Sequence, residues 1–326
     1  MITHPEFEVI VSALRKSAGI SAKRDIAFAA DRLSLTDGAV AVGDDCAAIP
    51  DGDGHLLFAI EGFMNEFVAA DPWFAGWCGV MVNLSDIAAM GGRPIAVVDA
   101  VWAKGEEGAD PILSGLKAAS STFAVPIVGG HTNLKTDRGQ LSVAVLGRAK
   151  SLLTSFDAAP GDWLIAVVDH RGAYREPFNN WQAALDAPPE RLRGDLDLLP
   201  QIAEAGLCRA AKDISQGGIV GTAIMLAECS CVSIDIDLNR IPIPYGVSLE
   251  RWLATFPSYG YLLSVANDKA QAVLDIFAAR GLTAAVIGAV EAGCSVSVRA
   301  GQSHAVIRNF RDEPLMQLQF GGAKKA

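Results

Sequence analysis

The segment Val82–Pro94 constrains the fold most, because it combines an apolar helix pattern with two polar side chains and an abrupt stop. It reads Val-Asn-Leu-Ser-Asp-Ile-Ala-Ala-Met-Gly-Gly-Arg-Pro. Asn83 and Asp86 are three positions apart and therefore share one face of a helix. The apolar residues around them predict a helix inside the protein, where a carboxylate is costly unless it is paired or binds a cation. Asp86 is therefore the first candidate for chemistry.

Length and charge narrow the class of protein. The 326 residues are 51% hydrophobic, which at about 100–200 residues per domain predicts two domains with cores of their own. The formal net charge of -10 argues against nucleic-acid binding, which needs clustered Lys and Arg. Six scattered cysteines fit reduced, mostly buried thiols. Neither a signal peptide nor a membrane helix is indicated, so we expect a cytoplasmic protein that does not bind membranes.

Hydrophobic periodicity predicts an α+β fold in both halves of the chain. In the first half we expect helices over 6–36, 71–90 and 108–123, and strands over 39–49, 56–60, 94–101, 125–128 and 141–147. In the second half we expect strands over 163–168, 233–238, 262–266 and 284–288, and helices over 219–229 and 268–280. Residues 170–200 are interpreted as a loop with a short helix. A composition shift near residue 150 separates the expected domains 1–155 and 156–326.

Two further carboxylate positions are candidates for chemistry. Asp44 and Asp45 follow Gly43 at a turn, where adjacent carboxylates repel unless a proton or cation separates them. Oxygen ligands at a turn suit magnesium, although such a pair is also typical of a solvated loop. Glu61 follows a strand and precedes a glycine, so it faces either a site or solvent.

Two glycine-containing segments could lie against a ligand. Gly129-Gly130-His131-Thr132 follows a strand, and we interpret it as a turn whose glycines allow close backbone approach to a phosphate. Asp213-Ile214-Ser215-Gln216-Gly217-Gly218 precedes an apolar helix, as either a helix cap or an anion or metal site. Lys23 is either a solvated surface lysine or a group that stabilises the charge of a transferred phosphate.

Together these segments resemble one family. Gly-Asp-Asp-Cys-Ala at 43–47, the segment 82–94, Gly-Gly-His-Thr at 129–132 and Asp-Ile-Ser-Gln-Gly-Gly at 213–218 occur in the family's order. The chain resembles the aminoimidazole ribonucleotide (AIR) synthetase-related superfamily, which includes thiamine-monophosphate kinase, selenophosphate synthetase and a hydrogenase-maturation protein. It is most similar to the sll0787-type AIR synthase-related subgroup. The resemblance implies a two-domain PurM-like α+β fold, with an N-terminal domain that builds a dimeric β-barrel with flanking helices and a C-terminal α/β sandwich domain.

The resemblance also implies ATP and magnesium as cofactors and a homodimer as the assembly. By position, Asp45, Asp86 and Asp213 match the family's metal-ligand aspartates. Lys23 and His131 are assigned the stabilisation of transferred charge. The residues assigned to the nucleotide and its phosphates are Asp44, Glu61, Asn83, Gly129, Gly130, Thr132 and Ser215.

Several positions depart from the characterised members. Glu61 stands where the family usually has an aspartate, and His131 and Gln216 stand where the kinase has aspartates. His131 resembles the selenophosphate enzyme instead. That enzyme's N-terminal Cys-Gly-Cys-Lys is absent, however, and only Lys23 matches it.

We therefore predict an ATP- and magnesium-dependent phosphotransferase or synthetase that acts on a small molecule. The alternatives are a nucleotide-binding module without turnover, an enzyme like thiamine-monophosphate kinase or selenophosphate synthetase, and a plain structural dimer. We expect the acceptor to contact parts of 170–200 and the loop 256–260.

Overall fold

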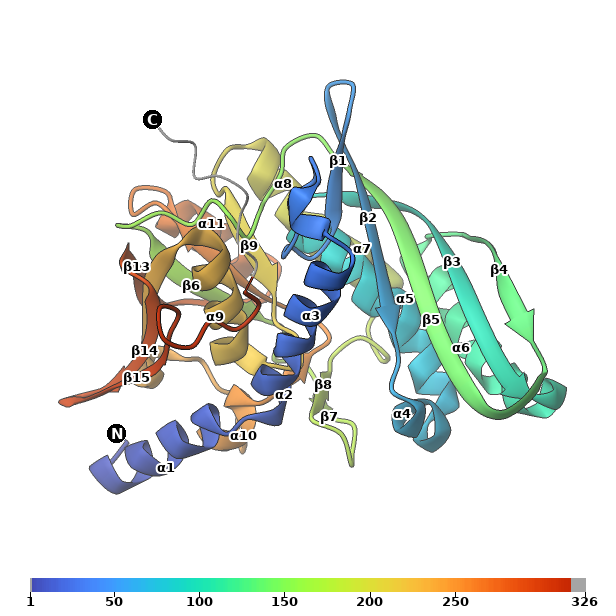
Figure 1. Cartoon of the computed structure of the whole chain (residues 1–326), viewed down its shortest axis with the longest axis horizontal. Helices are drawn as coiled ribbons and strands as arrows, with labels where there is room; N and C mark the ends of the chain where they lie inside the picture. Colours follow the sequence, from blue (N-terminus) through green and yellow to red (C-terminus); the bar gives the residue numbers. More distant parts are fainter. Residues whose placement is uncertain (1, 318–326) are drawn as a thin grey trace. The chain divides into compact units, whose positions relative to one another are not determined.

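The computed structural model describes residues 2–317, which divide into two compact units. The five-strand unit comprises residues 45–152 and 187–204. The seven-strand unit comprises residues 2–44, 153–186 and 205–317. Each unit combines sheets with helices (Figure 1). The expectation of two α+β parts is therefore confirmed.

The five-strand unit is built on one open sheet with the strand order β1-β2-β5-β3-β4. β3 and β4 are parallel and are joined by helix α6, whereas the other neighbouring pairs are antiparallel. The sheet is not closed into a barrel within the described residues, because β1 and β4 each have one neighbour. The strands are β1 (Ala47–Asp51), β2 (Gly54–Gly62), β3 (Arg93–Lys104), β4 (Ile127–Asn133) and β5 (Lys135–Ala149).

Helices α5 and α6 cover one face of this sheet (Figure 1). The predicted helix over 71–90 is confirmed, because Asp71 caps it by accepting a hydrogen bond from Phe74 N at 3.2 Å and Pro72 opens it. Nearly every residue of α5 after its first turn is buried. The helices of the unit are α4 (Asn65–Ala70), α5 (Pro72–Ala89), α6 (Gly105–Phe123), α7 (Pro189–Leu196) and α8 (Leu198–Glu204).

α5 and α6 touch through their backbones at two glycines. A Cβ added to Gly115 would lie 1.9 Å from Trp73 O, and one added to Gly76 would lie 2.1 Å from Ile112 O. Side chains at these positions would therefore force the helices apart. The close approach keeps α5 in the interior of the unit.

The returning segment 187–204 is held to the sheet and α6 by arginines. Arg93, from the Gly-Gly-Arg-Pro end of the opening segment, pairs with Asp197 Oδ1 at 2.6 Å and also with Glu204. Arg193 Nη1 donates to Thr122 O at 2.8 Å. Through these ion pairs Arg93 stabilises the packing of α7 and α8 against the sheet of this unit.

The seven-strand unit contains a mixed sheet with the strand order β15-β14-β10-β13-β6-β12-β9. Only the β10–β14 pair is parallel among the described strands of this sheet. β7, β8 and β11 form a second, three-stranded sheet. The strands are β6 (Trp163–Val168), β7 (Ala173–Tyr174), β8 (Asn180–Gln182), β9 (Ala210–Asp213), β10 (Val232–Asp237), β11 (Phe256–Pro257), β12 (Gly260–Val265), β13 (Thr283–Ala292), β14 (Ser295–Ala300) and β15 (Ser303–Asn309).

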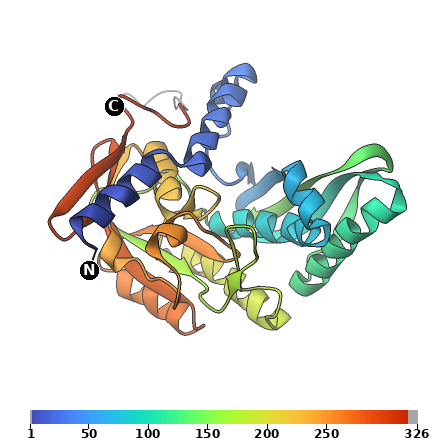
Figure 2. The same ribbon diagram turned by 90° about the horizontal axis from the view of Figure 1, so that it is seen from below.

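Helix α9 is the central helix of this unit, and it packs against β9, β10, β12 and β14. Phe7, Ile10, Val11 and Leu14, the predicted apolar face of the first helix, join the same core. Figure 2 shows this N-terminal segment from a second side. The helices and 3-10 turns are α1 (His4–Arg15), α2 (Ala18–Ser21), η1 (Ala22–Arg24), α3 (Asp25–Arg32), η2 (Leu35–Asp37), α9 (Gly218–Ser230), η3 (Leu238–Arg240), α10 (Leu249–Leu253) and α11 (Ala270–Ala278).

Several predicted segments differ in the structure, among them the helix expected over 6–36, which is divided into α1, α2, η1 and α3. The strand expected over 39–49 is present only as β1, since the acidic turn before Cys46 interrupts the extended backbone. Residues 129–132 are not a turn: they lie in β4, where glycine's missing side chain allows close pairing with β3. Among the helices of residues 2–317, none is long and apolar enough to cross a membrane.

Gly115→Ala should lower the free energy of unfolding by about 1–3 kcal/mol, because the new methyl group overlaps the backbone of α5. Gly108→Ala in the same helix is the matched control, since its Cβ would lie 3.7 Å from the nearest atom. There the better helix propensity of alanine should raise stability by up to about 1 kcal/mol. Urea unfolding measures both changes. Equal stability of the two variants would contradict the backbone contact.

Candidate functional site

The polar pair on α5 lies inside the five-strand unit. Asn83 and Asp86 are 0% and 5% exposed, so both are buried as predicted. Asn83 Nδ2 donates to Gly79 O at 2.8 Å, one turn earlier in the helix. Asn83 Oδ1 is buried and accepts no hydrogen bond from any described residue. A buried acceptor in this state costs about 1–3 kcal/mol, which a donor or cation from a ligand would offset.

Asp44, at the end of the first segment of the seven-strand unit, is engaged by a buried serine. Ser155 is 0% exposed; its Oγ donates to Asp44 Oδ1 at 2.7 Å, and its N donates to Asp44 Oδ2 at 2.9 Å. Lys212, 4% exposed, lies with its Nζ 3.4 Å from Ser155 Oγ. These three residues, here called the Asp44 relay, fix the carboxylate that precedes Asp45.

The Asp213–Gly218 loop is anchored at both of its ends. Asp213 ends β9 and is 6% exposed, and its carbonyl accepts from Thr222 Oγ1 at 3.2 Å. Gly218 has φ of +63°, and a Cβ there would lie 1.9 Å from Leu253 O, so this position requires glycine. Ser215 Oγ is buried and without a hydrogen-bond partner among residues 2–317. The loop is thus a rigid support for Asp213.

The helix-covered face of the five-stranded sheet carries two carboxylates in one row. Glu61 on β2 and Asp99 on β3 each pair with the buried Val143 on β5. Gly130 on β4 continues the row next to Asp99, and a Cβ there would lie 2.9 Å from Asp99 Oδ1. Burial raises the pKa of the Asp99 carboxyl group, because the charged form loses hydration.

The other predicted residues are more accessible. Gly129, Gly130, His131 and Thr132 are exposed on β4, an edge strand of the sheet, and the His131 ring lies 5.8 Å from that of Trp102. Lys23 is half-buried in η1.

The predicted metal ligands are divided between the units. Asp45 and Asp86 belong to the five-strand unit and Asp213 to the seven-strand unit. Within residues 2–317, His, Cys, Asp and Glu side chains form no group of three or more suited to a metal ion.

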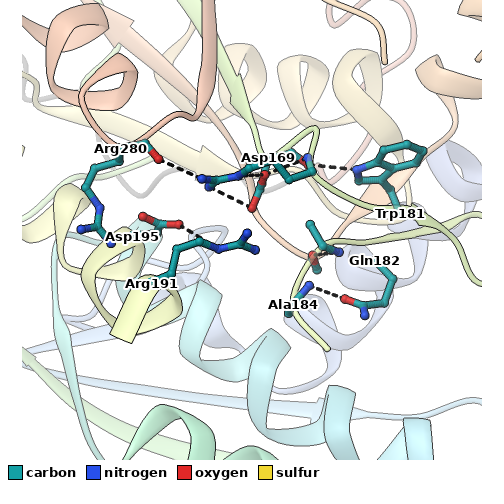
Figure 3. A network of polar contacts seen from close by, with 10 residues as sticks. Asp169, Trp181, Gln182, Ala184, Arg191, Asp195 and Arg280 are labelled. Atoms are coloured by element: carbon teal, nitrogen blue, oxygen red, sulfur yellow. Dashed lines mark hydrogen bonds and ion pairs between the residues drawn. The ribbon is translucent and has the colours of Figure 1, made fainter. Parts of the chain in front are cut away.

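The segment after β6 is organised by a buried aspartate. Asp169 accepts hydrogen bonds from Arg171 N at 2.9 Å and from Arg171 Nε at 2.7 Å. Arg171 Nη1 donates a hydrogen bond to Arg280 O at 3.0 Å, and Trp181 Nε1 donates one to Asp169 O at 2.9 Å (Figure 3). These contacts order the residues around β7 and β8, which were expected to form a loop.

Sequence reasoning missed Lys212, Ser155 and Asp99. Lys212 directly precedes Asp213, so its place in the motif was an available signal. Asp99 interrupts the apolar strand expected over 94–101, which was a weaker signal. Ser155 is 111 residues from Asp44, and nothing in the local sequence marks their contact.

Comparisons with known proteins agree with this fold. Residues 43–149 match the AIR synthase related protein, N-terminal domain, and residues 160–301 match the C-terminal domain of the same family. Protein sll0787 of Synechocystis is 47% identical over 312 residues, which cover 94% of this chain and 97% of that protein. The thiamine-monophosphate kinase of Pyrococcus abyssi is 28% identical, with 80% of this chain and 86% of the kinase covered.

Solved structures show the same fold. AaThiL complexed with AMPPCP and TMP has a TM-score of 0.65 at 22% identity, covering 84% of this chain and 93% of that one. Thermotoga maritima PurL complexed with ATP has a TM-score of 0.68 at 20% identity, covering 80% of this chain. The match spans 45% of the PurL chain, less than half of its length. With both family domains matched in order and sll0787 similar over nearly its full length, this protein belongs to the AIR synthase-related, PurM-like superfamily and to its sll0787-type subgroup.

Proposed function

We propose that the protein is an ATP- and magnesium-dependent phosphotransferase or synthetase that acts on a small molecule. The observation that carries the proposal is the buried Asn83–Asp86 pair on α5, with the unsatisfied acceptor Asn83 Oδ1. A fold that buries an amide oxygen in its interior without a hydrogen bond bears a cost. A bound cation and its hydration shell would offset that cost, and oxygen donors of this kind suit magnesium.

The relatives support a nucleotide-dependent reaction. Thiamine-monophosphate kinases and PurL are among the related enzymes, and the solved relatives include complexes with AMPPCP and ATP. Kinases and synthetases of this superfamily both use a nucleotide. The relatives therefore support nucleotide binding by this chain, and they do not identify the molecule that accepts the phosphate.

Each predicted ligand has a proposed role at its own place in the fold. Asp45 and Asp86 in the five-strand unit and Asp213 in the seven-strand unit would supply carboxylates to magnesium, which would neutralise phosphate charge. Asn83 Oδ1 would accept a hydrogen bond from a metal-bound water or the nucleotide. The Asp44 relay would hold the Asp44–Asp45 turn in one conformation.

The remaining candidates would contact the nucleotide or the transferred charge. Glu61, Gly129, Gly130 and Thr132 lie along β2 and β4 of one sheet, and Ser215 Oγ is an available donor in the Asp213–Gly218 loop. Lys23 and His131 would stabilise the transferred charge through their donor groups.

Asp86→Asn should weaken magnesium-dependent ATP binding by at least about 10- to 100-fold, the range seen when even outer groups of metal sites are removed. Asp110→Asn, at an exposed carboxylate on α6, changes the net charge equally and should bind ATP as the wild type does. Isothermal titration with and without magnesium measures both. Equal ATP affinity of Asp86→Asn and the wild type would contradict the proposal.

Turnover separates an enzyme from a binding module. ADP release stimulated by one compound in a metabolite panel would support the phosphotransferase or synthetase. Tight ATP binding without ADP release across the panel would favour a nucleotide-binding module.

Ser155→Ala should weaken magnesium-dependent ATP binding by roughly fivefold, corresponding to about 1 kcal/mol for a lost hydrogen bond to Asp44. Ser230→Ala is the matched control: Ser230 Oγ donates to Ser155 O at 2.7 Å and does not contact Asp44. Both variants should lower the melting temperature, but only Ser155→Ala should raise the magnesium concentration needed for ATP binding. A magnesium shift of the same size in both variants would contradict a role for the relay.

We also propose that the protein is a homodimer that buries the open face of the five-stranded sheet. Phe58 and Ile60 on β2 are 51% and 66% exposed, and Val98 on β3 is 39% exposed. Ile60 and Val98 both pair with Ala144 on β5, so these side chains share the face opposite α5 and α6. An exposed apolar patch of this kind favours association, and a self-complementary patch fits a two-fold dimer.

Ile60→Lys should convert the dimer into a monomer, because the interface would bury an unpaired charge. Light scattering after size exclusion should give twice the chain mass of 34.2 kDa for the wild type and a single chain mass for the variant. Val9→Lys, at a 57% exposed position on α1, should remain dimeric. A monomeric wild type at tens of micromolar would contradict the proposal.

A further inference from the structure

The seven-strand unit contains a cavity of about 330 Å³ next to the Asp213–Gly218 loop. Helix α1, the start of α2 with its cap Ser17, the loop itself and α10 line it. Ile10, Leu14 and Leu253 supply its apolar wall, and Asn179, Gln216 and Glu250 supply polar groups. At about 30 Å³ per water molecule, it has room for about ten water-sized groups. This volume lies at the lower end of small-molecule sites.

The walls of the cavity are held by backbone contacts. A Cβ on Gly19 would lie 2.2 Å from Gln216 O, so the start of α2 rests directly on the Asp213–Gly218 loop. The opposite side of that loop touches α10 at Gly218 and Leu253 O. α1 is itself tied to β15, because Arg15 Nη2 donates to Val306 O at 2.6 Å. The cavity is therefore formed before any ligand binds.

The charge of the lining selects the class of ligand. The cavity is lined by no Lys, Arg or His among the described residues, and Glu250 is the single charged residue that lines it. Anionic ligands such as phosphates and carboxylates would lack a counter-charge there. A neutral molecule would pack on Ile10, Leu14 and Leu253 and bond to the amides of Asn179 and Gln216. A positively charged amine would gain the additional attraction of Glu250.

We propose that this cavity, here called the α1 pocket, binds the apolar, uncharged or cationic portion of the acceptor. The assignment rests on the proposed phosphotransferase or synthetase function. Gln216 lines the pocket and is three residues from Asp213 on the same anchored loop. An acceptor seated there is thereby placed on the loop that carries a proposed magnesium ligand. The acceptor class is a small amine or alcohol with an apolar body.

Three probes of similar size test the charge preference on the full chain without ATP: 2-phenylethylamine, 2-phenylethanol and phenylacetate. Ligand-observed NMR titration should show binding of the amine and the alcohol, with the amine tighter by roughly two- to fivefold, as for an exposed ion pair. Phenylacetate should bind most weakly. Phenylacetate binding as tightly as the amine, or no binding of any probe, would overturn the proposal.

Variants locate the binding. Ala13→Phe fills the pocket from an exposed position on α1 and should abolish binding of the amine, whereas Ser12→Phe, next to it and outside the lining, should not. Glu250→Gln should remove the preference for the amine over the alcohol, and Glu8→Gln, an exposed carboxylate on α1, should keep it. Unchanged amine binding in Ala13→Phe would overturn the assignment.

Magnesium-dependent ATP binding separates the two proposals. Ala13→Phe should bind ATP as the wild type does while losing the amine. If the wild type binds the amine but not ATP, the proposed function fails and the α1 pocket stands as a ligand site only. If ATP binds but the amine does not, the pocket assignment fails and the proposed function stands.

Discussion

The backbone contact between α5 and α6 is the constraint on which the five-strand unit depends. Glycines at 76 and 115 let the two helices touch without intervening side chains. Gly79 lets α5 pack equally closely on the sheet, because a Cβ there would lie 2.7 Å from Val143 Cγ2 on β5. α5 is therefore enclosed on several sides, and Asn83 and Asp86 cannot turn toward solvent without breaking this packing. The position of the polar pair follows from the glycines.

The candidate carboxylates sit in different environments, although they resemble one another in sequence. Asp44 is held by two hydrogen bonds from a buried serine with a buried lysine beside that serine. Asp99 is half-buried beside a strand glycine, and burial favours its neutral form. In a chain with a net charge of -10, the burial of Lys212 is notable, because a buried ammonium group requires polar partners. A shared residue type thus does not imply a shared role.

Local signals in the sequence were sufficient for much of the fold. The Asp71-Pro72 cap predicted where α5 begins, and the Gly-Gly-Arg-Pro end predicted where it stops. The segment 129–132 was misjudged because paired glycines favour turns, whereas the neighbouring strand β3 holds them extended here. β14 and β15 were missed, although residues 295–300 alternate polar and apolar side chains, a pattern typical of a strand. Contacts between distant residues, such as Asp44 with Ser155, depend on the completed fold and leave no local pattern.

The ion pairs of Arg93 have a consequence for the order of folding. Its partners, Asp197 and Glu204, are supplied by a segment more than 100 residues later, after β6, β7 and β8 of the other unit. During synthesis the ribosome therefore releases all five strands of the sheet well before α7 and α8 are available. The nascent sheet must persist without its last two helices, and its exposed apolar side chains are then open to premature association. The five-strand unit is completed only when residue 204 has emerged.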